Sequence, residues 1–89
     1  MAFKSNFSDL FKRKYKSLTK KDSGLKERLK RKMEQIVENP ENHDIKKGNL
    51  RGIYGVHINP YVILYRIKGD TVEFLNVDHH DKAYNITIK

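Results

Sequence analysis

Residues 52–77, GIYGVHINPYVILYRIKGDTVEFLNV, contain three segments typical of β-strands. The segments are 52–58, 61–67 and 71–77. Each is rich in β-branched and aromatic residues or alternates apolar with polar positions. Turn signals separate them, namely Asn59-Pro60 and Lys68-Gly69-Asp70. Strands joined by such short turns pair antiparallel, so this stretch predicts a three-stranded antiparallel meander.

Two amphipathic helices are predicted before the meander. Ser8 is a favourable N-cap for the first helix, and Phe7 is placed to staple its start. The apolar positions recur at helical spacing, at Phe11, Tyr15 and Leu18 in the first helix and at Leu25, Leu29, Met33 and Ile36 in the second. Asp22-Ser23-Gly24 interrupts the pattern, and Asn39-Pro40 ends it. The sequence therefore predicts an antiparallel helical hairpin over about 8–39.

Helices followed by strands indicate the α+β class. We expect one domain, 1–89, because a chain of this length has no room for a second core. Its helical hairpin would pack on one face of a small antiparallel sheet of three to four strands. Residues 2–6 are a candidate edge strand. In the C-terminal segment, 78–89, we expect a terminal strand or an extended arm over 83–88.

Positive charge is concentrated in the first half of the chain. Lys and Arg number 19 against 11 Asp and Glu, which gives a net charge of +8. Residues 1–51 carry 15 basic and 7 acidic side chains, whereas residues 52–89 carry 4 of each. This segregation is typical of proteins with an anionic partner, most often nucleic acid. A solvated basic helix face, or an acidic protein partner, would give the same pattern.

Several classes of protein are excluded or not expected. The absence of cysteine excludes disulfides, zinc–thiolate sites and thiol catalysis. Residues 1–14 lack a signal-peptide core, and the longest uncharged run, 52–65, is too short and polar to cross a bilayer. We therefore expect a cytoplasmic protein without membrane contact. No glycine-rich phosphate loop, paired-carboxylate constellation or Ser-His-Asp arrangement is visible, so a nucleotide-binding enzyme or glycosidase is not expected.

Because the helices cover one face of the predicted sheet, the other face is expected to be free for chemistry. Strand alternation puts Tyr54 and His57 on opposite faces, and likewise separates Arg66 from Tyr65. His57 and Arg66 are polar residues in otherwise apolar strands. Which face each occupies depends on the register, which alternation alone does not determine.

The strings LRGIYGVHI (50–58), YVILYRI (61–67) and DHHDKAY (78–84), preceded by a basic helical hairpin, together resemble the RelE/ParE superfamily of bacterial and archaeal toxins. The resemblance implies a RelE-type ribonuclease that enters the ribosomal A site and cuts messenger RNA. It also implies a small, acidic, RelB-like antitoxin that holds the toxin inactive. The implied reaction is attack of the substrate's 2′-hydroxyl on the neighbouring phosphate, without metal or cofactor. Such a reaction needs a base, an acid and fixed positive charge.

The resemblance also implies which residues act. It assigns catalysis to His57, His80 and Tyr84. The RNA or phosphate contacts that it suggests are Arg51, Arg66, Tyr54, Lys82 and Lys47. The basic residues of the hairpin that would face the ribosome, or only solvent, are Lys12, Lys16, Lys30 and Arg31.

One position departs from the family pattern. Many members have an arginine that serves the scissile phosphate where this chain has Val62. Arg66 does not replace it, because four residues along a strand span about 13 Å. Histidines at positions 57 and 80 would compensate in part, since a histidine is a cation or a proton carrier near neutral pH.

Other interpretations of the same residues stay open. His57 is equally well explained as a half-buried histidine bonded to a backbone carbonyl, and His80 with Tyr84 as a surface histidine and a core tyrosine. No metal site is predicted at His79-His80-Asp81, because adjacent strand residues point to opposite faces and no i, i+4 histidine pair exists. A non-enzymatic toxin that poisons DNA gyrase, as in the ParE branch, and a plain RNA- or ribosome-binding module are the alternative functions.

Overall fold

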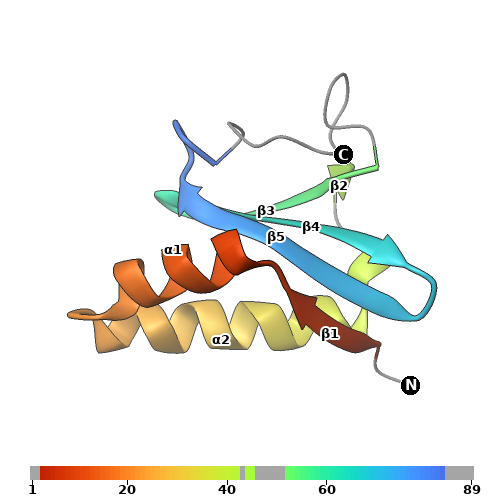
Figure 1. The fold of residues 1–89 in the computed structure, drawn as a ribbon, viewed down its shortest axis with the longest axis horizontal. Coiled ribbons are helices and arrows are strands. Elements are labelled where there is room, and N and C mark those ends of the chain that lie inside the picture. The colour runs from red at the N-terminus through yellow and green to blue at the C-terminus, as the bar shows by residue number, and fades with distance from the viewer. Residues whose placement is uncertain (1–2, 43, 46–51, 84–89) are drawn as a thin grey trace.

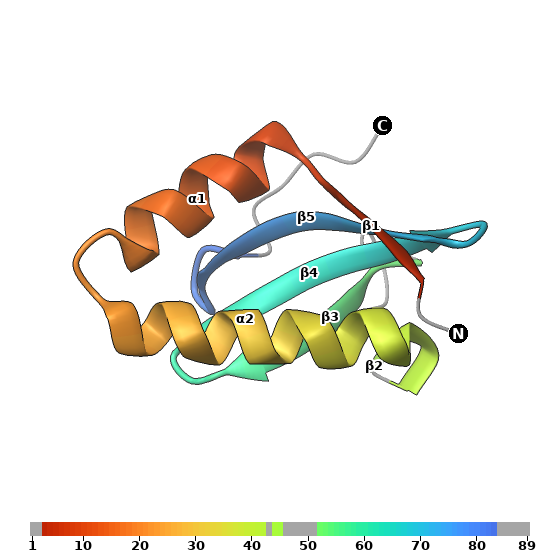
Figure 2. The same ribbon diagram turned by 90° about the horizontal axis from the view of Figure 1, so that it is seen from below.

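Two helices lie side by side against one face of a twisted sheet (Figures 1 and 2). The computed structural model describes residues 3–42, 44–45 and 52–83. In chain order the elements are β1 (Lys4–Phe7), α1 (Asp9–Thr19), α2 (Ser23–Glu38), a short 3₁₀ helix (Pro40–Asn42), β2 (Asp44–Ile45), β3 (Tyr54–Ile58), β4 (Tyr61–Lys68) and β5 (Thr71–His79). The α+β class and the helical hairpin on the sheet are thus confirmed. Neither described helix is long and apolar enough to span a membrane.

The sheet is mixed rather than purely antiparallel. In the described part of the chain its strand order is β1-β5-β4-β3-β2, and β3, β4 and β5 form the predicted antiparallel meander. The predicted edge strand near the N-terminus exists as β1, but it runs parallel to β5, from Lys4 beside Thr71 to Phe7 beside Phe74. A tight turn dictates antiparallel pairing, and no such turn joins β1 to β5. The direction of β1 is therefore set by the path through both helices.

Local capping explains where the helices begin and end. The Ser8 hydroxyl accepts a hydrogen bond from the Phe11 N–H at 2.9 Å and donates to the Leu75 carbonyl at 2.7 Å, which ties the start of α1 to β5. The Asp22 carboxylate accepts from the Leu25 N–H at 2.9 Å at the start of α2. The Asn39 N–H donates to the Gln35 carbonyl at the other end. Ser8 and Asp22 are of the side-chain types that satisfy the unpaired N–H groups at helix N-termini, whereas the Asn39 bond is made by the backbone.

The main core lies between the helices and the sheet. Its buried members are Phe11, Leu25, Leu29, Ile36, Val56, Ile58, Ile63, Tyr65, Val72, Phe74 and Val77. Tyr65 fixes one end of this core, because its hydroxyl donates to the Pro40 carbonyl at 2.6 Å. Burial, with Tyr54 as a lesser influence, raises the pKa of the Tyr65 phenol well above its usual range. The Tyr65 hydroxyl therefore keeps its proton and acts as a structural donor.

The opposite face of the sheet is not fully free, contrary to expectation. Ile53, Val62, Leu64 and Ala83 form a second buried cluster. Ala83 lies in the turn after β5, and its carbonyl accepts a hydrogen bond from the Asn76 side chain at 3.0 Å. The chain thus folds back over the apolar side chains of this face. The strand or arm predicted over 83–88 has only Ala83 within the described residues.

A register shift between β4 and β5 changes which side chains at the end of β5 face the helices. Leu64 pairs with Asn76, whereas Tyr65 pairs with Phe74, so Leu75 is an extra residue on β5. Such a bulge changes which residues face each side of the sheet. After it, Val77 joins the main core, and the strand ends at His79 beside Tyr61.

Candidate functional site

His57 and His80 come to the same end of the sheet. His57 pairs with Val62 on β4, and Val62 pairs with Asp78 on β5. Two strand spacings therefore separate the backbones of His57 and Asp78, about 10 Å. The His80 N–H donates to the Pro60 carbonyl at 2.9 Å, which joins the turn after β5 to the β3–β4 turn. Both histidine side chains are exposed, so neither is the half-buried histidine considered above for position 57.

The side chains of His79, His80 and Asp81 converge where β5 ends and the turn after it begins. The Asp81 carboxylate lies 3.0 Å from His80 Nε2 and 3.5 Å from His79 Nδ1. The two imidazole centroids are 5.0 Å apart. The expectation that the histidines point to opposite faces is wrong, because β5 ends at His79 and strand alternation stops there. Strand alternation therefore does not exclude a metal site at these residues.

Asp78 anchors this end of β5 to α1. Its carboxylate lies 3.1 Å from Lys14 Nζ and accepts a hydrogen bond from the His79 N–H at 2.8 Å. Burial alone would raise the pKa of Asp78, but the His79 N–H and the Lys14 ammonium outweigh it and hold that pKa below its usual range. Asp78 is therefore ionised at neutral pH. Its carboxylate is committed to structure rather than to proton transfer.

A basic hollow of about 410 Å³ lies beside His57, between α2 and the β3–β4 turn. We call this surface the basic hollow; its lining is Arg28, Arg31, Lys32, Gln35, His57, Ile58 and Asn59. Arg28 Nη2 donates to the Asn59 carbonyl at 3.1 Å, which holds α2 against the turn. Among the residues that the structure describes, no carboxylate lines the hollow, although Glu27 lies 3.7 Å from the exposed Arg31 guanidinium. The hollow is therefore suited to an anion.

Sequence reasoning missed Arg28, Lys32 and Gln35 as functional candidates. A signal was present, since Arg28 with Lys32 and Arg31 with Gln35 are spaced i, i+4 and so share a face of α2. That spacing does not say what the face meets. Only the packing of α2 beside the β3–β4 turn places it next to His57.

Two of the predicted RNA contacts lie away from this end of the sheet. The Tyr54 ring stacks on Tyr65, with centroids 5.1 Å apart, on the face that the helices cover. Arg66 Nε lies 2.6 Å from the Glu73 carboxylate in a cross-strand ion pair. Arg66 also lies four residues along β4 from Val62, the neighbour of His57. The structure thus brings neither side chain to His57.

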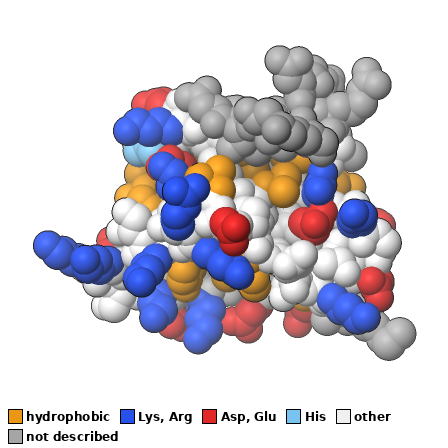
Figure 3. Space-filling view, viewed as in Figure 1, with side chains coloured by type: hydrophobic (Ala, Val, Ile, Leu, Met, Phe, Trp, Pro, Cys, Tyr) orange, Lys and Arg blue, Asp and Glu red, His pale blue; other side chains and the backbone are white. Residues whose placement is uncertain are grey.

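The remaining predicted site residues fall into two groups. Lys82 is exposed in the turn after β5, two residues from His80. The predicted contacts Arg51 and Lys47 and the predicted catalytic Tyr84 lie outside the described residues. The four basic residues predicted on the hairpin, Lys12, Lys16, Lys30 and Arg31, are all exposed. Figure 3 shows Lys and Arg side chains spread over the helical half of the molecule, with hydrophobic side chains between them.

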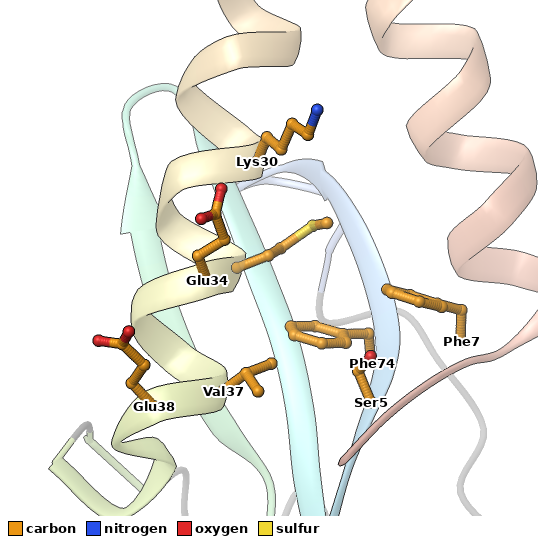
Figure 4. A pocket seen from close by; sticks show the side chains of 8 residues that line it. Ser5, Phe7, Lys30, Glu34, Val37, Glu38 and Phe74 are labelled. Carbon is orange, nitrogen blue, oxygen red and sulfur yellow. The ribbon is translucent and has the colours of Figure 1, made fainter. Parts of the chain in front are cut away.

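An apolar groove runs along the other border of α2 (Figure 4). One hollow of about 400 Å³ is lined by Ser5, Phe7, Lys30, Met33, Glu34, Val37, Glu38 and Phe74. An adjoining hollow of about 300 Å³ is lined by Phe7, Phe11, Lys12, Tyr15, Lys30 and Met33. Phe7, Lys30 and Met33 belong to both, and together the two hollows form what we call the apolar groove. Half-buried apolar side chains beside an exposed strand edge are typical of a protein-docking surface.

The chain is similar to a known protein family and to a known toxin. Residues 6–84 match the family described as "ParE toxin of type II toxin-antitoxin system, parDE". The RelE4 toxin of Methanocaldococcus jannaschii is 31% identical over 70 residues, which cover 75% of this chain and 74% of that protein.

Solved structures share the fold. The toxin–antitoxin complex RelBE2 from Mycobacterium tuberculosis matches with a TM-score of 0.74 and 20% identity, covering 89% of this chain and 92% of the other. The YoeB/ParE toxin from Agrobacterium tumefaciens matches with a TM-score of 0.76 and 15% identity, covering 86% of this chain and 98% of the other. Since the family match spans most of the sequence and the fold agrees, the chain belongs to the ParE toxin family of type II toxin–antitoxin systems, within the RelE/ParE superfamily.

Proposed function

We propose that this toxin is a ribosome-dependent endoribonuclease that cuts messenger RNA in the A site and thereby inhibits translation. The observation that carries the proposal is the placement of His57, His80 and the basic hollow at one end of the sheet. Groups that can transfer protons thus lie beside a concave surface lined by cations. Cleavage of a phosphodiester by its own 2′-hydroxyl needs this combination.

The histidines and the cations of the basic hollow have different roles in the proposed reaction. His80 protonates the departing 5′-oxygen, and His57 accepts the proton of the 2′-hydroxyl or holds the phosphate as a cation. Arg28 and Lys32 in the basic hollow bind a neighbouring backbone phosphate and so orient the substrate. Tyr84 remains a predicted stacking or proton-transfer residue. No step of this reaction requires a metal ion.

The cleavage products test the mechanism. We expect the purified toxin to cut messenger RNA on translating ribosomes in excess zinc chelator, provided that the magnesium of the ribosome is kept. The new ends should be 2′,3′-cyclic phosphates or 3′-phosphates, because the 2′-hydroxyl is the nucleophile. Mapping the ends and their chemistry on A-site codons is the measurement. Ends that carry a 3′-hydroxyl would instead indicate water activated by a metal and would contradict the proposal.

The same assay decides between this function and its alternatives. Gyrase poisoning is favoured by the match to the ParE family and by Val62 in place of the strand arginine. It predicts DNA breaks trapped on gyrase and intact messenger RNA. An RNA- or ribosome-binding module predicts co-sedimentation with ribosomes without new messenger ends. The two exposed histidines favour the ribonuclease, since an inhibitor of gyrase needs no proton-transfer groups.

We also propose that a small, acidic, RelB-like antitoxin binds this toxin at the apolar groove. The groove combines Phe7, Met33 and Val37 with two basic residues, Lys12 and Lys30, and two acidic residues of α2, Glu34 and Glu38. An amphipathic helix whose acidic residues lie against Lys12 and Lys30 would cover such a surface, and a strand of the same partner would pair with the exposed edge of β1. The net charge of +8 favours an acidic partner. The M. tuberculosis structure with the same fold is itself a toxin–antitoxin complex.

Met33→Glu is expected to weaken antitoxin binding by at least about tenfold, because a charge would replace a central apolar contact. Ser17→Glu is the matched control, since Ser17 is exposed on α1 and does not line the groove. Affinity would be measured on the co-expressed and separated proteins, with relief of growth arrest as the cellular readout. Equal affinities for the two variants would contradict docking in the groove. A toxin that is harmless alone at high expression in several hosts would contradict the function itself.

A further inference from the structure

Three side chains of metal-ligating type meet in the turn after β5. One ligand atom from each of His79, His80 and Asp81 lies within 4.8 Å of the others. The side chains are 42%, 57% and 69% exposed, so a cation from solvent can reach all three. The nearby Asp78 carboxylate is not available, because Lys14 and the His79 N–H hold it. The cluster thus offers two imidazole nitrogens and one carboxylate, and a cation bound at His79 Nδ1 would replace the long, 3.4 Å hydrogen bond that this atom accepts from the Asp81 N–H.

The distances suit a small, tetrahedrally coordinated ion. Metal–ligand bonds of about 2.0–2.1 Å place two ligands of a tetrahedral zinc site about 3.3 Å apart. The distances from His80 Nε2 to Asp81 Oδ1, 3.0 Å, and from His79 Nδ1 to Asp81 Oδ2, 3.5 Å, lie on either side of that value, so the two histidines face different oxygens of one carboxylate. The ligand nitrogens of the two histidines are at most 4.8 Å apart, so they must approach each other by no more than about 1.5 Å. Rotation of the exposed His80 ring supplies a movement of this size.

The backbone that carries the ligands is already held in place. The N–H groups of Lys82 and Ala83 both donate to the His79 carbonyl, at 2.8 and 2.9 Å, and the His80 N–H donates to Pro60. The His79 ring also meets the Tyr61 ring edge-on, with centroids 6.2 Å apart. Binding a cation therefore orders little more than two side chains, which lowers the entropic cost of forming the site.

We propose that His79, His80 and Asp81 bind Zn²⁺, and that the bound ion withholds His80 from RNA cleavage. Imidazole and carboxylate ligands are those of zinc sites, whereas Mg²⁺ and Ca²⁺ take oxygen ligands. Three protein ligands leave a fourth position for water. A His80 nitrogen that donates its lone pair to zinc neither accepts nor delivers a proton. The second half of the proposal rests on the proposed function, whereas zinc binding itself does not.

Zinc binding is tested on the purified toxin by competition with a chromophoric zinc chelator. We expect one Zn²⁺ per chain, with affinity at least about tenfold lower for His79→Ala and for Asp81→Asn. His57→Ala is the matched control, because it removes an exposed histidine outside the cluster and should keep the parent affinity. Mg²⁺ at the same concentration should not displace zinc. Unchanged affinity in His79→Ala and Asp81→Asn would overturn the site.

Regulation is tested by adding zinc to the ribosomal cleavage assay. Zinc should inhibit the parent toxin, and chelator should restore its activity, whereas His79→Ala should cleave in the presence of zinc. Equal inhibition of the parent and His79→Ala would overturn the regulatory role. A parent that shows no cleavage in zinc-free buffer would instead contradict the proposed function, and the chelator competition would still decide the zinc site.

Discussion

His80→Ala is expected to slow messenger cleavage by about 10²–10⁴-fold, the usual contribution of a positioned acid or base. His80 is exposed in the turn after β5, and the hydrogen bond from its N–H to Pro60 fixes its backbone at the end of the sheet that carries His57. In our proposal it protonates the departing oxygen. The variant should keep its fold and its antitoxin affinity, because the side chain lies outside both buried clusters. The measurements are the rate of appearance of new messenger ends and growth arrest on expression.

Neighbouring variants make the His80 assignment specific. His79→Ala should have a much smaller effect on cleavage, and His57→Ala an intermediate one. Tyr84→Phe distinguishes two roles of Tyr84. Cleavage should be lost if the hydroxyl takes part in the reaction and kept if the ring only stacks on a base. If His79→Ala abolishes cleavage and His80→Ala does not, the catalytic assignment moves to His79. If neither variant changes the rate, the chemistry lies with Arg51, Arg66 or the lysines.

Phe74→Ala is expected to lower the free energy of unfolding by about 3–5 kcal/mol, the cost typical of removing a buried phenylalanine ring. Phe74 is 0% exposed. Its ring lies 5.2 Å from that of Phe7, 5.4 Å from that of Phe11 and 6.1 Å from that of Tyr65, centroid to centroid. Phe74 thus joins β1, α1 and β4 through one side chain of β5. Since small domains are stable by only about 5–15 kcal/mol, the variant should be close to its unfolding threshold.

Urea unfolding monitored by circular dichroism is the measurement for Phe74→Ala. Leu75→Ala is the matched control, because Leu75 is the next residue along β5 and packs, only half-buried, against the smaller cluster. Leu75→Ala should lower the free energy of unfolding by less than half as much as Phe74→Ala, because it leaves a smaller cavity at a site that water already reaches. An equal decrease in the free energy of unfolding in the two variants would show that the rings around Phe74 are not the centre of the core.

Elements held by neighbouring residues were predictable. Ser8 and Asp22 cap the two helices through side-chain bonds to the N–H three residues on, so the capping signal is visible as a short string of letters. The meander was predictable for the same reason, because its strands are joined by turns whose residues are recognisable. The family resemblance added the expectation of toxin function, which the family match supports.

Most of the candidate site depends on contacts between distant residues. Because β5 ends at His79, His79 and His80 both reach Asp81, although alternation predicted that they point to opposite faces. A bulge shifts every later residue of its strand, and a pattern with a period of two does not show where the shift occurs. The expected opposite orientation of His79 and His80 was therefore wrong.

The sequence alone established the helix caps, the turn-linked strands and the segregated positive charge, whereas only the family resemblance suggested His57 and His80 as site residues. The tertiary structure alone established that Arg28 and Lys32 border His57, that β1 runs parallel to β5, and that Ala83 covers part of the outer sheet face. Hydrogen bonds within a few residues leave a signature in the local sequence. The meeting of α2 with the β3–β4 turn arises from burial of the whole apolar surface, which no short segment encodes.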